Sequence, residues 1–157
     1  MRIRPAEESD LPVLALIEKT CFSTPWSENE LRSSLMNREL YRFYVAEEEG
    51  EIAGYSGMSL ILSEADVDNV AVLPRFRRRG IGRALLQQMI ADAEALSMES
   101  VILEVRDSNL PAITLYENLG FRMIGFRKQY YQNPAEGARI YALRLPAAER
   151  RNQSEES

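Results

Sequence analysis

Residues 69–83 read Asn69-Val70-Ala71-Val72-Leu73-Pro74-Arg75-Phe76-Arg77-Arg78-Arg79-Gly80-Ile81-Gly82-Arg83. This segment predicts a strand that stops at Pro74, then a turn with two glycines, then the start of a helix. The helix is expected because apolar side chains recur at i, i+3, i+4 and i+7 spacing from Leu85 to Leu96. The strand–turn–helix order favours an α/β fold.

The turn has the features of an anion-binding site. The first turn of a helix leaves backbone N–H groups unpaired, and the helix dipole adds partial positive charge there. Gly80 and Gly82 would let the backbone approach a ligand closely. The arginines around them can make charge-assisted contacts to phosphate, so a pyrophosphate fits best. The alternative is an arginine-rich surface turn that binds nothing.

Two well-known phosphate motifs do not match. The dinucleotide-binding fingerprint needs a third glycine after Gly82, and the Walker loop needs Gly-Lys-Ser/Thr; neither is present.

The composition limits the possible function classes. The chain has 157 residues, one cysteine and no histidine. This length predicts one domain. The composition excludes an internal disulfide and histidine-dependent catalysis, and we expect no metal site. Acid–base chemistry would therefore fall to carboxylates, tyrosines, water and backbone amides. Because no apolar leader or bilayer-spanning run is visible, we expect a soluble cytoplasmic protein with no membrane role.

The charge is unevenly distributed. The net charge is −5, yet five arginines lie between Arg75 and Arg83 with no acidic residue among them. An acidic chain with one compact basic segment favours a small polyanion over a long nucleic acid, so we expect no direct nucleic-acid role. The acidic remainder would suit a cationic second substrate.

The rest of the chain predicts alternating strands and helices. A helix is expected from Asp10, as its N-cap, with Leu11, Leu14, Leu16 and Ile17 as its apolar positions. Ser27 and Glu30 form a capping box for a second helix, and Pro111 opens a third that ends at Leu119, with Gly120 as the C′ residue. The strands are expected at residues 3–5, 41–47, 52–62, 67–72, 101–105, 121–126 and 138–145. The sequence predicts one domain over residues 1–146 and a flexible polar tail over residues 147–157.

A second segment, Leu103 to Phe121, carries candidate acid–base residues. Glu104 interrupts an apolar run, where burial would raise the pKa of its carboxyl and make it a general base. The alternative is a Glu104 that is solvated or paired with Arg106. Asn109 and Tyr116 are seven residues apart and share one helix face. Tyr116 is either a proton donor or a packed aromatic residue.

These segments together resemble a known superfamily. Arg77 to Gly82 resembles the R/Q-x-x-G-x-G/A motif of the GNAT acetyltransferases, and Asn109 to Phe121 resembles their second cofactor-binding motif. Three further segments look closer still to the bacterial members that acetylate the N-terminal alanine of a ribosomal protein; these are Phe22–Trp26, Leu103–Arg106 and Arg127–Tyr131. The resemblance extends to about Leu145.

The resemblance implies a single-domain GNAT acyl-CoA N-acyltransferase fold. Its mixed central sheet would splay at the cofactor site, with helices on both faces. Acetyl-CoA would bind through its pantetheine arm to the backbone of Val70, Ala71 and Val72. The remaining cofactor residues implied by the resemblance are Arg78, Arg79, Gly80, Ile81, Gly82 and Arg83 for the pyrophosphate, and Asn109 for positioning.

The resemblance also implies the catalytic roles and the substrate. Glu104 would be the general base and Tyr116 the general acid for direct attack by an amine on the thioester. Trp26, Tyr130 and Tyr131 would contact the acceptor, expected to be the N-terminus of a small-subunit ribosomal protein. The enzyme is expected to act as a monomer or weak dimer.

The pKa of the acceptor amine helps to choose among substrates. An α-amine near pKa 7.8 is about one-third neutral at pH 7.5, whereas a lysine near 10.4 is only about 0.1% neutral. A single carboxylate base therefore suits an α-amine better. The alternatives are a GNAT enzyme with broader N-terminal, lysine or small-amine specificity, and a non-catalytic acetyl-CoA-binding module.

Overall fold

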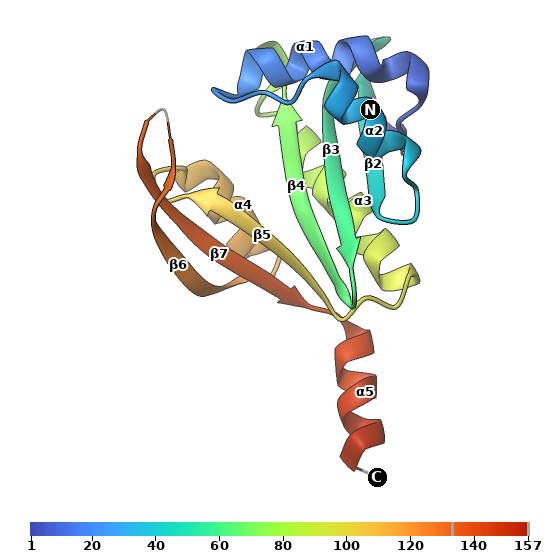
Figure 1. The fold of residues 1–157 in the computed structure, drawn as a ribbon, viewed down its shortest axis with the longest axis vertical. Helices are drawn as coiled ribbons and strands as arrows, with labels where there is room; N and C mark the ends of the chain where they lie inside the picture. The colour runs from blue at the N-terminus through green and yellow to red at the C-terminus, as the bar shows by residue number, and fades with distance from the viewer. Residues whose placement is uncertain (133, 157) are drawn as a thin grey trace. The chain divides into compact units, whose positions relative to one another are not determined.

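The protein forms a seven-stranded mixed sheet with helices, as the sequence predicts (Figure 1). The computed structural model describes residues 1–132 and 134–156. The strand order is β1-β2-β3-β4-β5-β7-β6. The strands are β1 (Arg2–Pro5), β2 (Tyr41–Glu48), β3 (Glu51–Ile61), β4 (Glu64–Val72), β5 (Ser100–Arg106), β6 (Arg122–Tyr131) and β7 (Glu136–Arg144). The helices are α1 (Leu11–Cys21), α2 (Glu28–Met36), α3 (Ile81–Ala95), α4 (Leu110–Asn118) and α5 (Pro146–Glu156), with short 3₁₀ turns η1 (Glu8–Asp10) and η2 (Pro74–Phe76).

The fold divides into two compact units. The amino-terminal unit comprises residues 1–61 and 68–91, and the carboxy-terminal unit comprises residues 62–67 and those from 92 onward. Each unit is described by itself below. No helix within the described ranges is long and apolar enough to cross a membrane.

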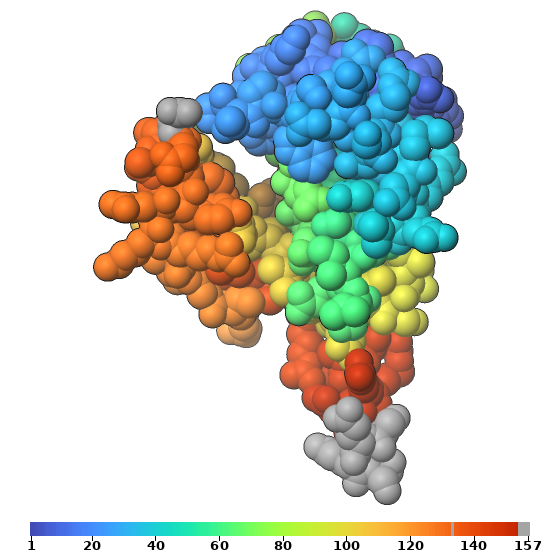
Figure 2. Space-filling model, in the orientation of Figure 1, coloured from blue at the N-terminus to red at the C-terminus, as the bar shows by residue number. Residues whose placement is uncertain are grey.

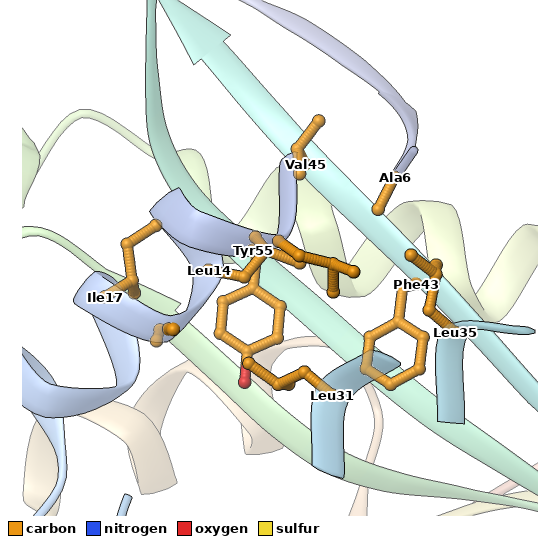
Figure 3. Close-up of a cluster of buried hydrophobic side chains, with 11 residues drawn as sticks. Ala6, Leu14, Ile17, Leu31, Leu35, Phe43, Val45 and Tyr55 are labelled. Carbon is orange, nitrogen blue, oxygen red and sulfur yellow. The ribbon is translucent and has the colours of Figure 1, made fainter. Parts of the chain in front are cut away.

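The amino-terminal unit has its core beneath α1 and α2. β1, β2 and β3 pair antiparallel, and Figure 3 shows Tyr55 of β3 packed among Leu14, Ile17 and Leu31. Burying each of these aliphatic side chains contributes about 2 kcal/mol.

The predicted capping box of α2 is confirmed: the Ser27 hydroxyl accepts from the N–H of Glu30, and the side chain of Glu30 accepts from the N–H of Ser27. The side chains of α1 and α2 form a continuous outer surface, coloured blue to cyan in Figure 2.

Helix α1 differs from its prediction in two places. Asp10 makes no N-cap bond to the helix; its carboxylate instead accepts from Arg4 and from the N–H of Glu7. Leu16, expected in the core, is 59% exposed, while Glu18 is only 1% exposed. The buried stripe runs through positions 11, 14, 15 and 18, which is the i, i+3, i+4, i+7 series. That series places Glu18, rather than Leu16, on the core side.

Strand β4 and helix α3 flank the arginine-rich turn of residues 73–80. β4 pairs in parallel with β5 over Glu64–Val67 and continues to Val72. The predicted amphipathic helix is confirmed, because its buried positions repeat at helical spacing; they are Ile81, Leu85, Leu86, Met89 and Ala93.

In the carboxy-terminal unit, β5 and β6 both pair antiparallel with β7, and α4 lies against one face of these strands (Figure 1). The apolar run at 101–105 predicts a strand covered on both faces, which is wrong. Val101, Leu103 and Val105 are buried, while Ile102 and Glu104 remain partly exposed. Alternation along a strand puts these two sets on opposite faces. Gly120 ends α4 at φ 97°, as predicted for a helix C-terminus.

The polar C-terminal segment forms helix α5, where the sequence predicts a flexible tail. Pro146 lies in its first turn, and the residues that follow are mostly good helix formers. Arg151 forms an ion pair with Glu99 at 2.9 Å. The domain boundary at 146 stays a prediction.

Candidate functional site

The glycine turn before α3 has the backbone geometry that its sequence requires. Arg78 and Gly80 both adopt left-handed conformations, at φ 65° and 79°, and Gly80 meets that requirement without a side-chain penalty. Gly82 is different, because a Cβ added there would meet only Val72 Cγ2 at 3.9 Å. The protein's own packing therefore leaves space over the first turn of α3, as close approach by a ligand requires.

The five arginines of this turn divide into three groups. Arg75 and Arg79 form ion pairs with Glu51 and Glu49 at 2.9 and 3.1 Å. Their guanidinium groups lie 4.7 and 5.2 Å from the centre of the Phe76 ring. These contacts hold both side chains on the turn between β2 and β3.

The other three arginines have different surroundings. Arg77 Nε donates to the carbonyl of Val72 at 3.1 Å and so braces the end of β4. Arg78 and Arg83 form no ion pair within residues 1–132 and 134–153. Three arginines, Arg78, Arg79 and Arg83, are predicted to bind phosphate. In the described part of the chain Arg79 is ion-paired with Glu49, whereas Arg78 and Arg83 have no ion-pair partner.

The predicted cofactor strand, Val70–Val72, passes very close to β3. A Cβ on Gly54 would lie 2.5 Å from the carbonyl oxygen of Ala71 and 3.2 Å from Val72 Cα. The carbonyl of Val72 also accepts from the thiol of Cys21 at 3.6 Å. Burial raises the pKa of that thiol, so Cys21 is poorly suited to act as a nucleophile.

In the carboxy-terminal unit, Glu104 faces a cation and a phenol. Its Oε1 lies 3.7 Å from Nη1 of Arg127, and the hydroxyl of Tyr130 donates to the carboxylate. The side chain is 28% exposed, so the burial expected from the apolar run is only partial. The alternative pairing with Arg106 is wrong, because Arg106 forms its ion pair with Glu136 at 3.1 Å.

Two tyrosines predicted from sequence interact with Glu104, and a third interacts with one of them. The rings of Tyr130 and Tyr131 meet edge to face at 5.1 Å. The hydrogen bond to Glu104 raises the pKa of Tyr130. Burial raises the pKa of Tyr131 to about 12, and the charge of Glu104 acts in the same direction. Tyr131 also interacts with Tyr116, so residues from β5, α4 and β6 belong to one cluster.

Tyr116 contributes a phenol from α4. Its ring packs against Phe121 at 6.0 Å, and burial raises the pKa of its hydroxyl. No hydrogen bond joins this hydroxyl to another group in the described part of the chain. A phenol that stays protonated at neutral pH and has no internal acceptor is available to donate to a ligand.

Arg106 and Glu136 shape the hairpin that carries the tyrosines, and the sequence analysis gave neither a role there. Arg106 donates to the carbonyls of Gln132 and Pro134, and its guanidinium lies 4.4 Å from the centre of the Tyr131 ring. Glu136 accepts from the N–H and hydroxyl of Ser108. The only sequence signal for Arg106 was its position directly after the strand expected at residues 101–105.

Asn109 and Trp26 have structural contacts of their own. Asn109 is the N-cap of α4, with its Oδ1 accepting from the N–H of Ala112 at 3.3 Å. The backbone N–H of Trp26, in the amino-terminal unit, donates to Oε1 of Glu18 at 3.0 Å. Their predicted roles toward the cofactor and the acceptor stay predictions.

The comparison with known families now decides the assignment. Residues 11–121, which contain α3, Glu104 and Tyr116, match the Acetyltransferase (GNAT) family. The chain belongs to the GNAT acetyltransferase family. The GNAT match covers more than two-thirds of the sequence, and the family's use of acetyl-CoA accords with the glycine turn and with Arg78 and Arg83.

Relatives of this GNAT chain share most of its length. It is 38% identical over 143 residues to the [ribosomal protein bS18]-alanine N-acetyltransferase of Escherichia coli, covering 90% of this chain and 95% of that enzyme. A Bacillus subtilis protein described as a putative enzyme of the same name is 30% identical, covering 88% of this chain and 91% of the relative.

Two solved structures have the same fold as this chain. The crystal structure of the ribosomal-protein-S18-alanine N-acetyltransferase of E. coli has a TM-score of 0.83 at 37% identity, covering 91% of this chain and 92% of that one. A Salmonella typhimurium protein solved with acetyl-CoA is only 20% identical and shares the fold, at a TM-score of 0.81, covering 92% of this chain and 93% of that one.

Proposed function

We propose that this chain transfers the acetyl group of acetyl-CoA to the α-amine of a ribosomal protein that begins with alanine. The observation that carries this proposal is the 38% identity to the E. coli enzyme across nearly the full length of both chains. The cluster of Glu104 with Tyr116, Tyr130 and Tyr131 supplies side chains for the acid–base steps.

Glu104 acts as the general base. The acceptor α-amine attacks the thioester carbonyl as its proton passes to the carboxylate of Glu104, so that a C–N bond forms while the C–S bond breaks. Arg127 at 3.7 Å and the hydroxyl of Tyr130 orient the carboxylate. A positioned base of this kind contributes about 10²–10⁴-fold to the rate.

Tyr116 acts as the general acid. The sulfur that leaves the carbonyl carbon needs a proton, and Tyr116 is a protonated phenol with no acceptor among the residues that the structure describes. Its raised pKa keeps that proton in place at neutral pH, before the thiolate forms.

The amino-terminal unit supplies the residues for acetyl-CoA, which brings the acetyl group as a thioester. The left-handed turn at Arg78 and Gly80 exposes backbone N–H groups at the start of α3, and such groups bind phosphate. The open space over Gly82 lets a ligand approach the backbone there. The chain's residues therefore fit a pyrophosphate.

The reaction is tested with pairs of peptides. A peptide with free N-terminal alanine and no lysine is incubated with acetyl-CoA, beside an N-blocked copy that contains one lysine, and mass spectrometry locates the acetyl group. We expect acetylation of the first peptide only, because its α-amine is far less protonated than lysine. Acetylation of the lysine peptide alone would replace the proposal with a lysine acetyltransferase, and no transfer with retained CoA binding would indicate a binding module.

The cofactor assignment is tested with matched arginine variants. We expect the double variant Arg78→Ala/Arg83→Ala to raise the KM for acetyl-CoA about tenfold, as the loss of two charge-assisted contacts predicts. Arg75→Ala/Arg79→Ala, which removes the same charge from the Phe76 side of the turn, should change this KM by less than about threefold. Equal effects would show that only the overall charge of the turn matters.

A further inference from the structure

Glu18 holds both ends of the loop that contains the only tryptophan. Its side-chain Oε1 accepts from the N–H of Trp26 at 3.0 Å, and its backbone carbonyl accepts from the N–H of Phe22 at 3.0 Å. Residues 22–26 are called the Trp26 loop. The side chain and the backbone carbonyl of Glu18 therefore each accept a hydrogen bond from one end of this loop.

Glu18 also interacts with the strands beneath it. The side chains of Tyr55 in β3 and Asn69 in β4 both interact with the carboxylate. Asn69 Nδ2 donates to the hydroxyl of Tyr55 at 2.6 Å. Figure 3 shows the ring of Tyr55 within the buried cluster, its hydroxyl oxygen drawn red. The contacts therefore continue from the Trp26 loop through Glu18 and Tyr55 to β4.

This arrangement is costly for folding alone. Glu18 is 1% exposed, and its Oε2 is buried without a hydrogen-bond partner in the described part of the chain. A buried carboxylate oxygen without a partner costs free energy, and apolar groups of similar volume often stabilise such a position. A polar residue here is better explained by the groups that it orients than by packing.

We propose that Glu18 is a positioning residue that fixes the Trp26 loop for the acceptor peptide and is itself held in place by Tyr55 of β3 and Asn69 of β4. The identity of the peptide rests on the function proposed above; the ordering of the loop does not. Val70–Val72 of the same β4 strand is the predicted acetyl-CoA segment, so the loop and the cofactor strand share one buried support.

The loop order is measured through Trp26, because the chain has a single tryptophan. In Glu18→Ala, which removes the acceptor for the Trp26 N–H, we expect acrylamide to quench the tryptophan fluorescence about twofold more strongly than in the wild type. Glu18→Gln keeps an acceptor oxygen and should stay near the wild type. Lys19→Ala, an exposed change in the same helix, is the matched control.

Steady-state kinetics then separate positioning from folding. Glu18→Ala should raise the KM for the alanine peptide about tenfold and change the KM for acetyl-CoA little, a loss comparable to that of one hydrogen bond. Glu18→Gln should recover most of the loss. Unchanged quenching in Glu18→Ala, or an equal rise in both KM values with a lower melting temperature in both variants, would overturn the proposal. If the wild type acetylates no alanine peptide, the proposed function fails, while the quenching result still decides the role of Glu18 in the loop.

Discussion

Two glutamates, one in each unit, lie in opposite surroundings. Glu18 of α1 is 1% exposed, one of its oxygens has no hydrogen-bond partner among the described residues, and burial raises the pKa of its carboxyl. Glu104 of β5 has a side chain 28% exposed and lies beside Arg127 and the hydroxyl of Tyr130. Glu104 interrupts an apolar run, yet the more deeply buried carboxylate is the one on an amphipathic helix. The neighbours that the fold brings in, rather than the residues adjacent in sequence, determine each environment.

The largest expected effect tests whether Glu104 alone is the base. Glu104→Gln should lower kcat by about 100-fold or more while CoA binding is retained, because the amide cannot accept the proton of the amine. Rates at saturating substrate and CoA titrations measure both quantities. The matched control is Glu117→Gln, on the exposed side of α4.

Two outcomes of this experiment would contradict the distinction between Glu104 as the base and Glu18 as a supporting residue. If Glu104→Gln had the wild-type rate from about pH 6 to 9, Glu104 would not be the base. If Glu18→Gln lost as much kcat as Glu104→Gln, the two carboxylates would share the chemistry rather than divide into base and support.

The second largest expected effect concerns Tyr116, the phenol that α4 contributes to the cluster. Tyr116→Phe should lower kcat by about tenfold to 100-fold, because the change removes the proton donor and keeps the ring that packs on Phe121. The measurement is kcat beside the melting temperature, which should hardly change. A variant with the wild-type kcat would leave Tyr116 with a packing role only.

The carboxylate of Asp10 tests whether burial or hydrogen bonding to a cation determines the pKa of a buried acidic side chain. Asp10 is 6% exposed, yet the hydrogen bonds from Arg4 at 2.8 and 2.9 Å lower the pKa of its carboxyl despite burial. Asp10→Asn should therefore cost about 2 kcal/mol of unfolding free energy at neutral pH. This advantage of the wild type is present above the unfolded pKa of about 3.9 and is lost as the pH falls through the lower folded value. Urea unfolding from about pH 2 to 7 measures it, and a pH-independent difference would contradict the assignment.

For Glu18, the contribution to the free energy of unfolding should change with pH in the opposite direction, and the change should be smaller. Its folded pKa is raised by burial, so the native state holds its proton more tightly than the unfolded chain. The stability of the wild type relative to Glu18→Gln should fall, by about 1 kcal/mol, as the pH rises above the unfolded pKa of about 4.3. The same urea series measures this. Parallel slopes for Asp10→Asn and Glu18→Gln would show that burial alone governs both carboxylates.

Much of the fold and site followed from local sequence patterns. The capping box at Ser27, the stripe of α3 and the Gly120 stop were predictable because each depends on residues within one or two helical turns. Glu104 and Tyr116 were candidates from the sequence of their own segment, Tyr130 and Tyr131 came through the resemblance to GNAT acetyltransferases, and the structure brings all four into one cluster.

The remaining contacts were not visible in the sequence because their partners lie far apart along it. Arg127 reaches Glu104 from a neighbouring part of the sheet, across 23 positions. Arg79 pairs with Glu49, 30 positions away, a contact that no local sequence pattern indicates. Glu18 could have been found by extending the i, i+7 series from Leu11, but the adjacent Leu16 and Ile17 made an apolar pattern seem complete without it.

The close approach of Gly54 to β4 bears on how freely this position can vary. A side chain there would meet the carbonyl of Ala71 at 2.5 Å, and a backbone oxygen held in a strand cannot move aside as a flexible side chain can. At Gly82 a methyl group would meet only a side-chain carbon at 3.9 Å. In a library randomised at both positions and selected for folded protein alone, position 54 should return glycine. Position 82 should also accept alanine, and only a second selection for acetyl-CoA use would distinguish the residues there.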